Sequence, residues 1–216
     1  MIDILKKTGI DEKDLKIIIS LYWGQSETMR IDGETTEAVK IERGVRQGCV
    51  LSSLLFNIYS EQIFKEALEG EEEGITINGE RLSNIRYYAD DTIVFADSKQ
   101  GLQRLVNKIA TTSNKYGLDI NNKKTKLMLI SKNTNKNAQI LVNNQQIERV
   151  PHTIYLGTII NENRDTAQEI KTRIAKATAA FNKMSKVFKS HDLTIETKTW
   201  LLKCYFFSIL LYGAES

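Results

Sequence analysis

Apolar residues recur along the chain with two different periods, and these periods predict its helices and strands. Near the N-terminus, over residues 51–68 and over residues 102–116, apolar side chains return every three or four residues, which is typical of amphipathic helices. Asp11 is a suitable N-cap for the second of the N-terminal helices. The apolar helical positions are Ile4, Leu5, Leu15, Ile18, Ile19 and Tyr22 near the N-terminus, and Leu54, Leu55, Ile58, Ile63, Phe64 and Ala67 in the second segment.

Short strands joined by tight turns are predicted between these helices. Asp32-Gly33 within residues 29–40 is a strong signal for a two-residue hairpin turn. Further strands are predicted over residues 75–77, before a turn at Asn78-Gly79, and over residues 85–88, 92–95 and 127–131. Residues 140–147 are predicted to form a hairpin with its turn at Asn143-Asn144, and residues 154–160 a short strand or hairpin around Gly157. This mixture of helices and short hairpins predicts an α+β fold.

A basic helical region is expected after residue 163. Between Lys171 and Lys203 the sequence has eight basic and two acidic residues. Lysines occur on one side of the predicted helix, and an apolar series occupies the other side: Ile170, Ile174, Ala177, Phe181, Met184 and Phe188. We therefore predict a mixed α+β unit over residues 1–163 and a basic helical unit over residues 164–216.

Composition narrows the class of protein without deciding its function. The chain has 216 residues and a formal net charge of only +3, so nucleic acid is compatible as a partner but is not required by charge. Two distant cysteines, Cys49 and Cys204, argue against a disulfide framework. No signal peptide is visible, and no apolar run approaches the roughly 20 residues of a membrane span. We expect an intracellular protein with no membrane partner.

The adjacent carboxylates Asp90 and Asp91 are the sharpest chemical feature of the sequence. They lie between two apolar strands, at the tip of a predicted hairpin. Hard cations such as Mg²⁺ bind oxygen ligands and substrate phosphates, so this pair is a candidate metal site for phosphoryl transfer. The alternative is that both residues serve turn formation alone, since aspartate favours turns.

A second motif precedes the helix predicted over residues 51–68. Gly44-Val45-Arg46-Gln47-Gly48-Cys49 places glycines on both sides of two side chains that can donate hydrogen bonds. Glycines allow close approach of the backbone to a ligand, and Arg46 and Gln47 could bind a phosphate or a base edge. A loop whose glycines only turn the chain is the alternative.

The order of these motifs resembles reverse transcriptases of non-LTR (LINE-like) retrotransposons. Residues 44–57 resemble the loop and helix that contact template and nucleotide, and Tyr88-Ala89-Asp90-Asp91 resembles the aromatic-x-Asp-Asp catalytic turn. Residues 117–126 resemble the next family motif, and Tyr155-Leu156-Gly157 resembles the hairpin that grips the primer end. The basic helices up to Tyr212-Gly213 resemble the start of the thumb.

The resemblance implies a function and a role for each matching residue. It implies an RNA-directed DNA polymerase that uses Mg²⁺ or Mn²⁺, an RNA template, a DNA primer and deoxynucleoside triphosphates, with insertion at nuclear DNA. By this resemblance, Asp90 and Asp91 bind the metal and Lys124 protonates the leaving pyrophosphate. The residues implied to contact the substrate are Arg46, Gln47, Gly48 and Tyr88. Those implied to grip the primer are Tyr155, Leu156 and Gly157, and those implied to contact the duplex are Lys171, Lys176, Lys183 and Lys186. For Lys124 and for the helical lysines, a merely solvated basic surface is the alternative.

The sequence also departs from the family pattern. Val50 and Ser53 stand where prolines are usual, and Asp119 stands where the family often has a basic or neutral residue. No segment matches the motif that supplies the family's first catalytic aspartate. We therefore expect a partial right-hand polymerase palm, without fingers and without that strand, over residues 1–163, followed by a thumb-like region. The alternative to a polymerase fragment is an inactive retroelement remnant that at most binds nucleic acid.

Overall fold

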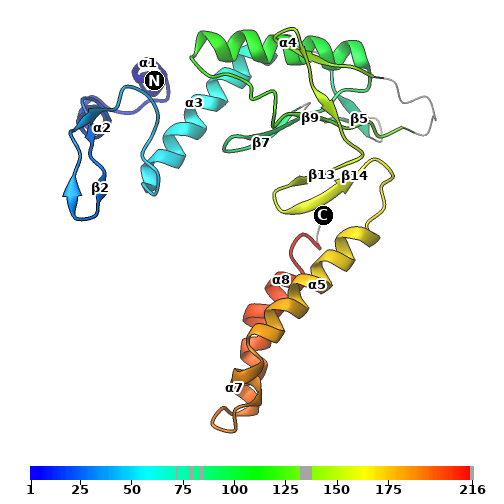
Figure 1. The fold of residues 1–216 in the computed structure, drawn as a ribbon. Helices are drawn as coiled ribbons and strands as arrows, with labels where there is room; N and C mark the ends of the chain where they lie inside the picture. Colours follow the sequence, from blue (N-terminus) through cyan, green and yellow to red (C-terminus); the bar gives the residue numbers. More distant parts are fainter. Residues whose placement is uncertain (72, 78–79, 83–84, 132–137, 215–216) are drawn as a thin grey trace. The chain divides into compact units, whose positions relative to one another are not determined.

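The computed structural model describes residues 1–71, 73–77, 80–82, 85–131 and 138–214. Over these residues the chain forms helices and short strands, which confirms the predicted α+β class (Figure 1). Two compact units divide the chain: residues 1–121 with 141–145, and residues 122–140 with 146–216. The functional division predicted at residue 163 stays a prediction.

The first unit contains four helices and most of the short hairpins among its described residues. Its helices are α1 (Ile2–Lys7), α2 (Glu12–Tyr22), α3 (Val50–Leu68) and α4 (Lys99–Lys115). Its strands are β1 (Ser26–Glu27), β2 (Arg30–Ile31), β3 (Glu34–Thr35), β4 (Val39–Lys40), β5 (Ile75–Ile77), β6 (Glu80–Leu82), β7 (Ile85–Tyr88), β8 (Asp91–Val94) and β10 (Leu141–Val142).

Several of the sequence predictions for this unit are confirmed. The Asp11 side chain caps α2 by accepting a hydrogen bond from the Asp14 amide at 2.8 Å. Strands β2 and β3 pair across the turn at residues 32–33, and β1 pairs with β4. The predicted Asn78-Gly79 turn lies outside the described residues. One prediction needs correction: Leu54, placed on the apolar side of α3, is 55% exposed.

Buried apolar side chains form two clusters in the first unit. One joins Leu5 of α1, Leu15 and Ile18 of α2, and Leu55 of α3. The other joins Ala67 at the C-terminal end of α3 with Ile85 of β7 and Ile109 of α4. Because burial of a leucine or isoleucine side chain contributes about 1.5–3 kcal/mol, these clusters fix α3 against both the N-terminal helices and the β7–β8 hairpin.

The second unit consists of hairpins followed by helices. Its strands are β9 (Lys126–Leu127), β12 (Glu148–Arg149), β13 (His152–Tyr155) and β14 (Thr158–Asn161), and β11 (Gln145–Gln146) pairs with β10 at the division of the units. Its helices are α5 (Ala167–Lys183), α6 (Ser185–Lys189), α7 (Ile195–Leu201), the π-helical segment η1 (Leu202–Phe207) and α8 (Ser208–Leu210). The strand predicted over residues 127–131 is wrong in extent, since β9 ends at Leu127 and pairs in parallel with β12.

Aromatic side chains connect the helices of the second unit. The rings of Phe181, Phe188 and Phe206 lie 5.1–5.4 Å apart, centre to centre, and Phe206 is buried. Helix α5 therefore runs alongside η1 and α8 (Figure 1). Packing is nevertheless partial along α5, because Ile170 and Ile174 of the predicted apolar side are 55% and 51% exposed.

Candidate functional site

The two adjacent aspartates lie at the tip of the β7–β8 hairpin, as predicted. Ala89 and Asp90 form the turn, and Tyr88 pairs with Asp91, the first residue of β8. Ala89 has a φ of 53°, a left-handed conformation that costs a residue other than glycine about 1–2 kcal/mol. Both carboxylates are exposed, and the Tyr88 side chain is 68% exposed. The hairpin thus presents two carboxylates and an aromatic ring on a tight turn.

The loop before α3 adopts the backbone conformation for which its glycines are suited. Gly44 and Gly48 have φ angles of 102° and 79°, in the region that side chains disfavour. Arg46 and Gln47 between them are exposed, and Arg46 Nε donates a hydrogen bond to Gln25 Oε1 at 2.9 Å. The loop therefore holds its two donor side chains at the surface, directly before the helix.

A cavity of about 520 Å³ lies between α3 and the tip of the β7–β8 hairpin. Its lining includes Ser53, Asn57 and Glu61, spaced four residues apart on one side of α3, together with Tyr88 and Ala89 of the hairpin tip. Glu61 was not a sequence candidate, although its spacing from Asn57 places both residues on one side of a helix. Its carboxylate also forms an ion pair with Lys65 at 3.1 Å. The first unit thus has a cavity beside the aspartate turn that is lined by both polar and apolar side chains.

The site residues predicted before the basic helical region of the second unit fall in two places. Lys124 is exposed in the turn before β9. Tyr155, Leu156 and Gly157 lie in the β13–β14 hairpin, where Leu156 and Gly157 form the turn with φ angles of 47° and 82°. The predicted hairpin around Gly157 is therefore confirmed, while its role in holding a primer stays a prediction.

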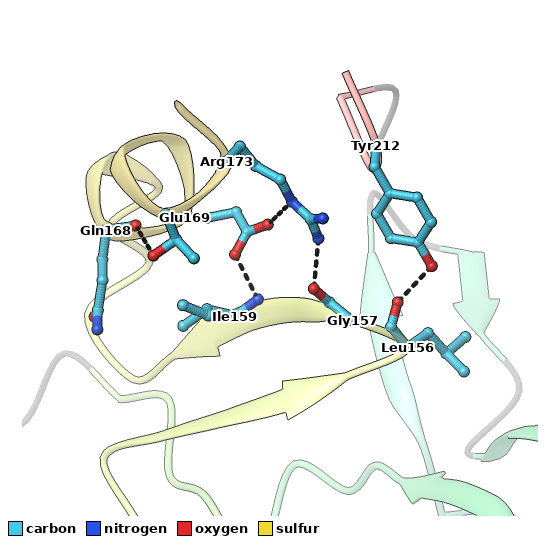
Figure 2. Close-up of polar contacts among 8 residues, drawn as sticks. Leu156, Gly157, Ile159, Gln168, Glu169, Arg173 and Tyr212 are labelled. Carbon is cyan, nitrogen blue, oxygen red and sulfur yellow. Dashed lines mark hydrogen bonds and ion pairs between the residues drawn. The ribbon is translucent and has the colours of Figure 1, made fainter. Parts of the chain in front are cut away.

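Arg173 and Tyr212 bond to the tip of this hairpin, and sequence reasoning did not select either of them as a site residue (Figure 2). The Tyr212 hydroxyl donates to the Leu156 carbonyl at 2.6 Å, and the Arg173 guanidinium donates to the Gly157 carbonyl and to Glu169. The Ile159 amide and then Arg173 hold the pKa of the Glu169 carboxyl below its usual value by hydrogen bonding. No local sequence signal connects Tyr212 to residues more than fifty positions earlier.

The lysines of the basic helical region remain at the surface. Lys171, Lys176 and Lys183 of α5 and Lys186 of α6 are all exposed. Lys176 and Lys183 are seven residues apart and therefore lie on one side of α5, about two helical turns from each other. Lys171 lies further round the helix. This arrangement is compatible with both the duplex contact and the solvated surface considered above.

Cys49 has a polar environment at the start of α3. Its Sγ lies 3.2 Å from the Tyr22 hydroxyl, which also lies 2.9 Å from the Ser52 hydroxyl. Hydrogen bonding, first from Tyr22 and then from backbone amides of the helix start, lowers the pKa of the Cys49 thiol to about 7. A thiolate is thus available near neutral pH directly beside the glycine-containing loop.

We expect Cys49 to be alkylated by iodoacetamide with a pH midpoint near 7. The thiolate is the reactive form, so the rate should rise with pH up to that midpoint and then level off. In Tyr22→Phe, which removes the first cause of the lowered pKa, the midpoint should move upward toward the usual value of about 8.5. Mass spectrometry on a Cys204→Ser background measures this thiol alone. The same midpoint in both proteins would contradict the assigned cause.

Neither a group of three or more metal-binding side chains nor a membrane-spanning helix occurs in the described residues. In that part of the chain no three His, Cys, Asp or Glu side chains are grouped so that they could hold a metal ion. Among the same residues, no helix combines the length and the apolar character needed to cross a membrane.

Comparison with known proteins identifies the family. The family described as reverse transcriptase (RNA-dependent DNA polymerase) matches residues 2–160. The Pol polyprotein of the retrotransposable element R2DM from Drosophila melanogaster is 30% identical over 119 residues, which are 55% of this chain and 11% of that protein. The R2 polyprotein of Nasonia vitripennis is 25% identical over 74% of this chain and 16% of its own length.

A third relative covers nearly the whole chain. The RNA-directed DNA polymerase from the mobile element jockey of Drosophila funebris is 23% identical over 96% of this chain. The chain spans 23% of that protein, and so corresponds to a small part of each of these relatives. The family match covers most of the chain and includes both the loop before α3 and the aspartate turn. The chain therefore belongs to the reverse transcriptase (RNA-dependent DNA polymerase) family, in the part of it that comprises non-LTR retrotransposons.

Proposed function

We propose that this chain forms the palm and part of the thumb of an RNA-directed DNA polymerase, with residues 1–163 as palm and 164–216 as thumb. The observation that supports this most directly is the exposed Asp90-Asp91 turn beside the cavity shared with α3. The substrates are an RNA template, a DNA primer and deoxynucleoside triphosphates. Primer extension on an RNA template tests the proposal. It is measured on this chain fused to the corresponding upstream segment of a family member, and compared between the native sequence and Asp90→Ala.

The reverse transcriptase family depends on divalent metal ions, and the donors present at the turn fit such an ion. Two adjacent carboxylates supply hard oxygen ligands of the kind that Mg²⁺ and Mn²⁺ prefer. We assign the metal to Asp90, as principal ligand, and to Asp91. When bound, the ion supplies charge neutralisation for the phosphates and polarises the primer hydroxyl. Tyr88, beside the carboxylates on the same turn, is assigned to pack near the primer terminus.

The other assigned roles follow from the positions at which this chain resembles the family motifs. The exposed Arg46 and Gln47 and the positive-φ Gly48 are assigned to the nascent base pair and its phosphates, because an exposed loop of this kind allows close approach of a ligand. Lys124 is assigned as the general acid that protonates the leaving pyrophosphate. The β13–β14 tip, with Tyr155, is assigned to the primer end.

A non-catalytic protein that only binds nucleic acid is the second candidate, and the exposed lysines of α5 and α6 favour it independently of the aspartates. The primer extension experiment separates the two candidates. Extension that depends on Asp90 supports the polymerase, whereas duplex binding without any Asp90-dependent extension supports the second candidate.

Manganese binding tests the assigned metal ligands apart from activity. We expect Mn²⁺ at about millimolar concentration to broaden the amide NMR signals of residues 88–92, since two carboxylates on one turn give a weak, incomplete ligand set. In the Asp90→Asn, Asp91→Asn double variant this broadening should disappear. Broadening that persists in the double variant would exclude these carboxylates as the ligands, and Asp97→Asn, a change at another exposed aspartate after β8, serves as the matched control.

A further inference from the structure

Side chains from outside the β13–β14 hairpin bond to three of its backbone groups (Figure 2). The Leu156 carbonyl accepts from Tyr212, and the Gly157 carbonyl accepts from Arg173. The Ile159 amide donates to Glu169 Oε2 at 2.8 Å. The backbone carbonyls of both turn residues, Leu156 and Gly157, therefore accept hydrogen bonds from side chains. These bonds connect the hairpin tip to α5 through Arg173 and to the turn that contains Tyr212.

The conformation of the tip needs this support. Leu156 has a φ of 47°, which a branched L side chain rarely adopts, and Gly157 follows with a φ of 82°. Such conformations persist only where surrounding contacts hold them, and they concentrate at functional sites. Tyr212 bonds to the carbonyl of Leu156 itself. The hydrogen bond from Tyr212 therefore stabilises Leu156, the turn residue whose backbone conformation is the less favourable of the two.

Arg173 acts within the protein rather than on a ligand. It is buried, with 8% of its surface exposed, and its Cζ lies 4.5 Å from the centre of the Tyr212 ring. Glu169 accepts from its guanidinium and balances its charge. Because these contacts use both the fork of donors and the cationic plane, Arg173 orients the Tyr212 ring and the Gly157 carbonyl together.

The tip of the β13–β14 hairpin also forms one wall of a cavity of about 620 Å³. Leu156 and Tyr212 line this cavity together with Thr158 and the exposed Lys203. Beside the hydrogen-bonded turn, the cavity thus combines hydroxyl groups, the Lys203 cation and apolar surface. This combination suits one sugar-phosphate end of a strand, whose phosphate can reach the lysine.

We propose that Arg173 and Tyr212 are positioning residues, which hold the β13–β14 tip in the shape that receives the recessed 3′ end of the primer. The inference rests on the proposed function, since that function assigns this hairpin to the primer. Tyr212 acts through Leu156, and Arg173 acts through Gly157 and through the Tyr212 ring. Neither residue is assigned to the reaction itself.

The test compares two RNA–DNA duplexes by fluorescence anisotropy, one with a recessed DNA 3′ end and one with blunt ends. We expect Tyr212→Phe, which removes only the hydroxyl, to weaken binding of the recessed duplex about threefold to tenfold, as for a single hydrogen bond. Binding of the blunt duplex should not change. Arg173→Lys, which keeps the charge and loses the fork, should weaken binding of the same recessed duplex.

Arg149→Met is the matched control, because Arg149 bonds to Glu162 at 2.9 Å beside the opposite end of the same hairpin. It should leave the preference for the recessed end unchanged. Hydrogen exchange at the Gly157 and Thr158 amides gives a second measurement, and should become faster in Tyr212→Phe. A purely structural role would lower the affinity for both duplexes equally.

Several results would overturn the inference. They are a wild-type chain that binds both duplexes equally, a Tyr212→Phe variant with unchanged preference for the recessed end, and unchanged exchange at the tip. Each of them leaves the proposed polymerase function standing if primer extension still depends on Asp90. Conversely, loss of that dependence would refute the polymerase and leave the hydrogen bond between Tyr212 and the hairpin intact.

Discussion

Primer extension on an RNA template should fall on the order of 10³-fold or more when Asp90 is replaced by alanine. Metal polarisation of the reacting oxygens contributes several kcal/mol to catalysis, and each 1.4 kcal/mol corresponds to about a factor of ten in rate. Asp90 is exposed at the turn of the β7–β8 hairpin, so its removal takes away a ligand without opening a hole in the core. The loss should therefore appear in the rate of extension and not in the stability of the fold.

The experiment needs the family's remaining carboxylate, because Asp90 and Asp91 supply only two. We expect residues 1–216 alone to give no detectable extension with Mg²⁺ and all four deoxynucleotides. A fusion that places the corresponding upstream segment of the Drosophila melanogaster R2DM polyprotein before Met1 should extend the primer. Asp97→Ala in this fusion is the matched control, since Asp97 is also exposed and follows the same hairpin.

Two outcomes would contradict this prediction in different ways. Extension by the fusion that is equal in Asp90→Ala would exclude the aspartate turn from the reaction. Extension by the unfused chain that disappears in Asp90→Ala would show instead that another carboxylate of these 216 residues completes the metal site. Equal thermal unfolding of all variants, measured by circular dichroism, excludes misfolding as the cause of a loss.

The second large effect concerns salt. If the lysines of α5 and α6 contact a duplex backbone, the affinity should be independent of base sequence and should fall steeply as salt rises, because binding releases condensed counterions. Replacing Lys176, Lys183 and Lys186 by glutamine should then reduce the slope of log affinity against log salt concentration by roughly two to three units. Fluorescence anisotropy between about 50 and 200 mM salt measures this slope.

A control with the same change in net charge makes this result specific. Lys6, Lys13 and Lys16 are exposed on α1 and α2, and their replacement by glutamine also removes three positive charges. This control triple variant should keep the wild-type slope. Equal slopes in the two triple variants and the wild type would assign the helical lysines of α5 and α6 to a solvated surface.

The sequence pattern predicted the tight turns well, because interactions among neighbouring residues determine their conformation. The Asp-Gly pair at residues 32–33 and the Asn-Asn pair at residues 143–144 lie in turns with positive φ angles. Such residue pairs favour tight hairpins irrespective of the remaining fold. Burial along α3 was predicted less well, since Leu54 is exposed beside the buried Leu55. Periodicity gives the side of a helix, but the neighbouring elements decide how much of that side they cover.

By itself, the sequence determined the family and the candidate chemistry of this protein. The chemistry is visible in two local patterns: two adjacent aspartates close after an aromatic residue, and a glycine-flanked Arg-Gln pair before a helix. Each pattern can be recognised from neighbouring residues alone, without knowing which distant residues it contacts. Only the tertiary structure decided which distant groups meet. It placed Glu61 and Asn57 beside Tyr88 in one cavity, and it bonded Tyr212 to Leu156 across more than fifty residues. A hydrogen bond to a backbone carbonyl leaves no pattern in the sequence of the carbonyl's residue, because every residue has that group.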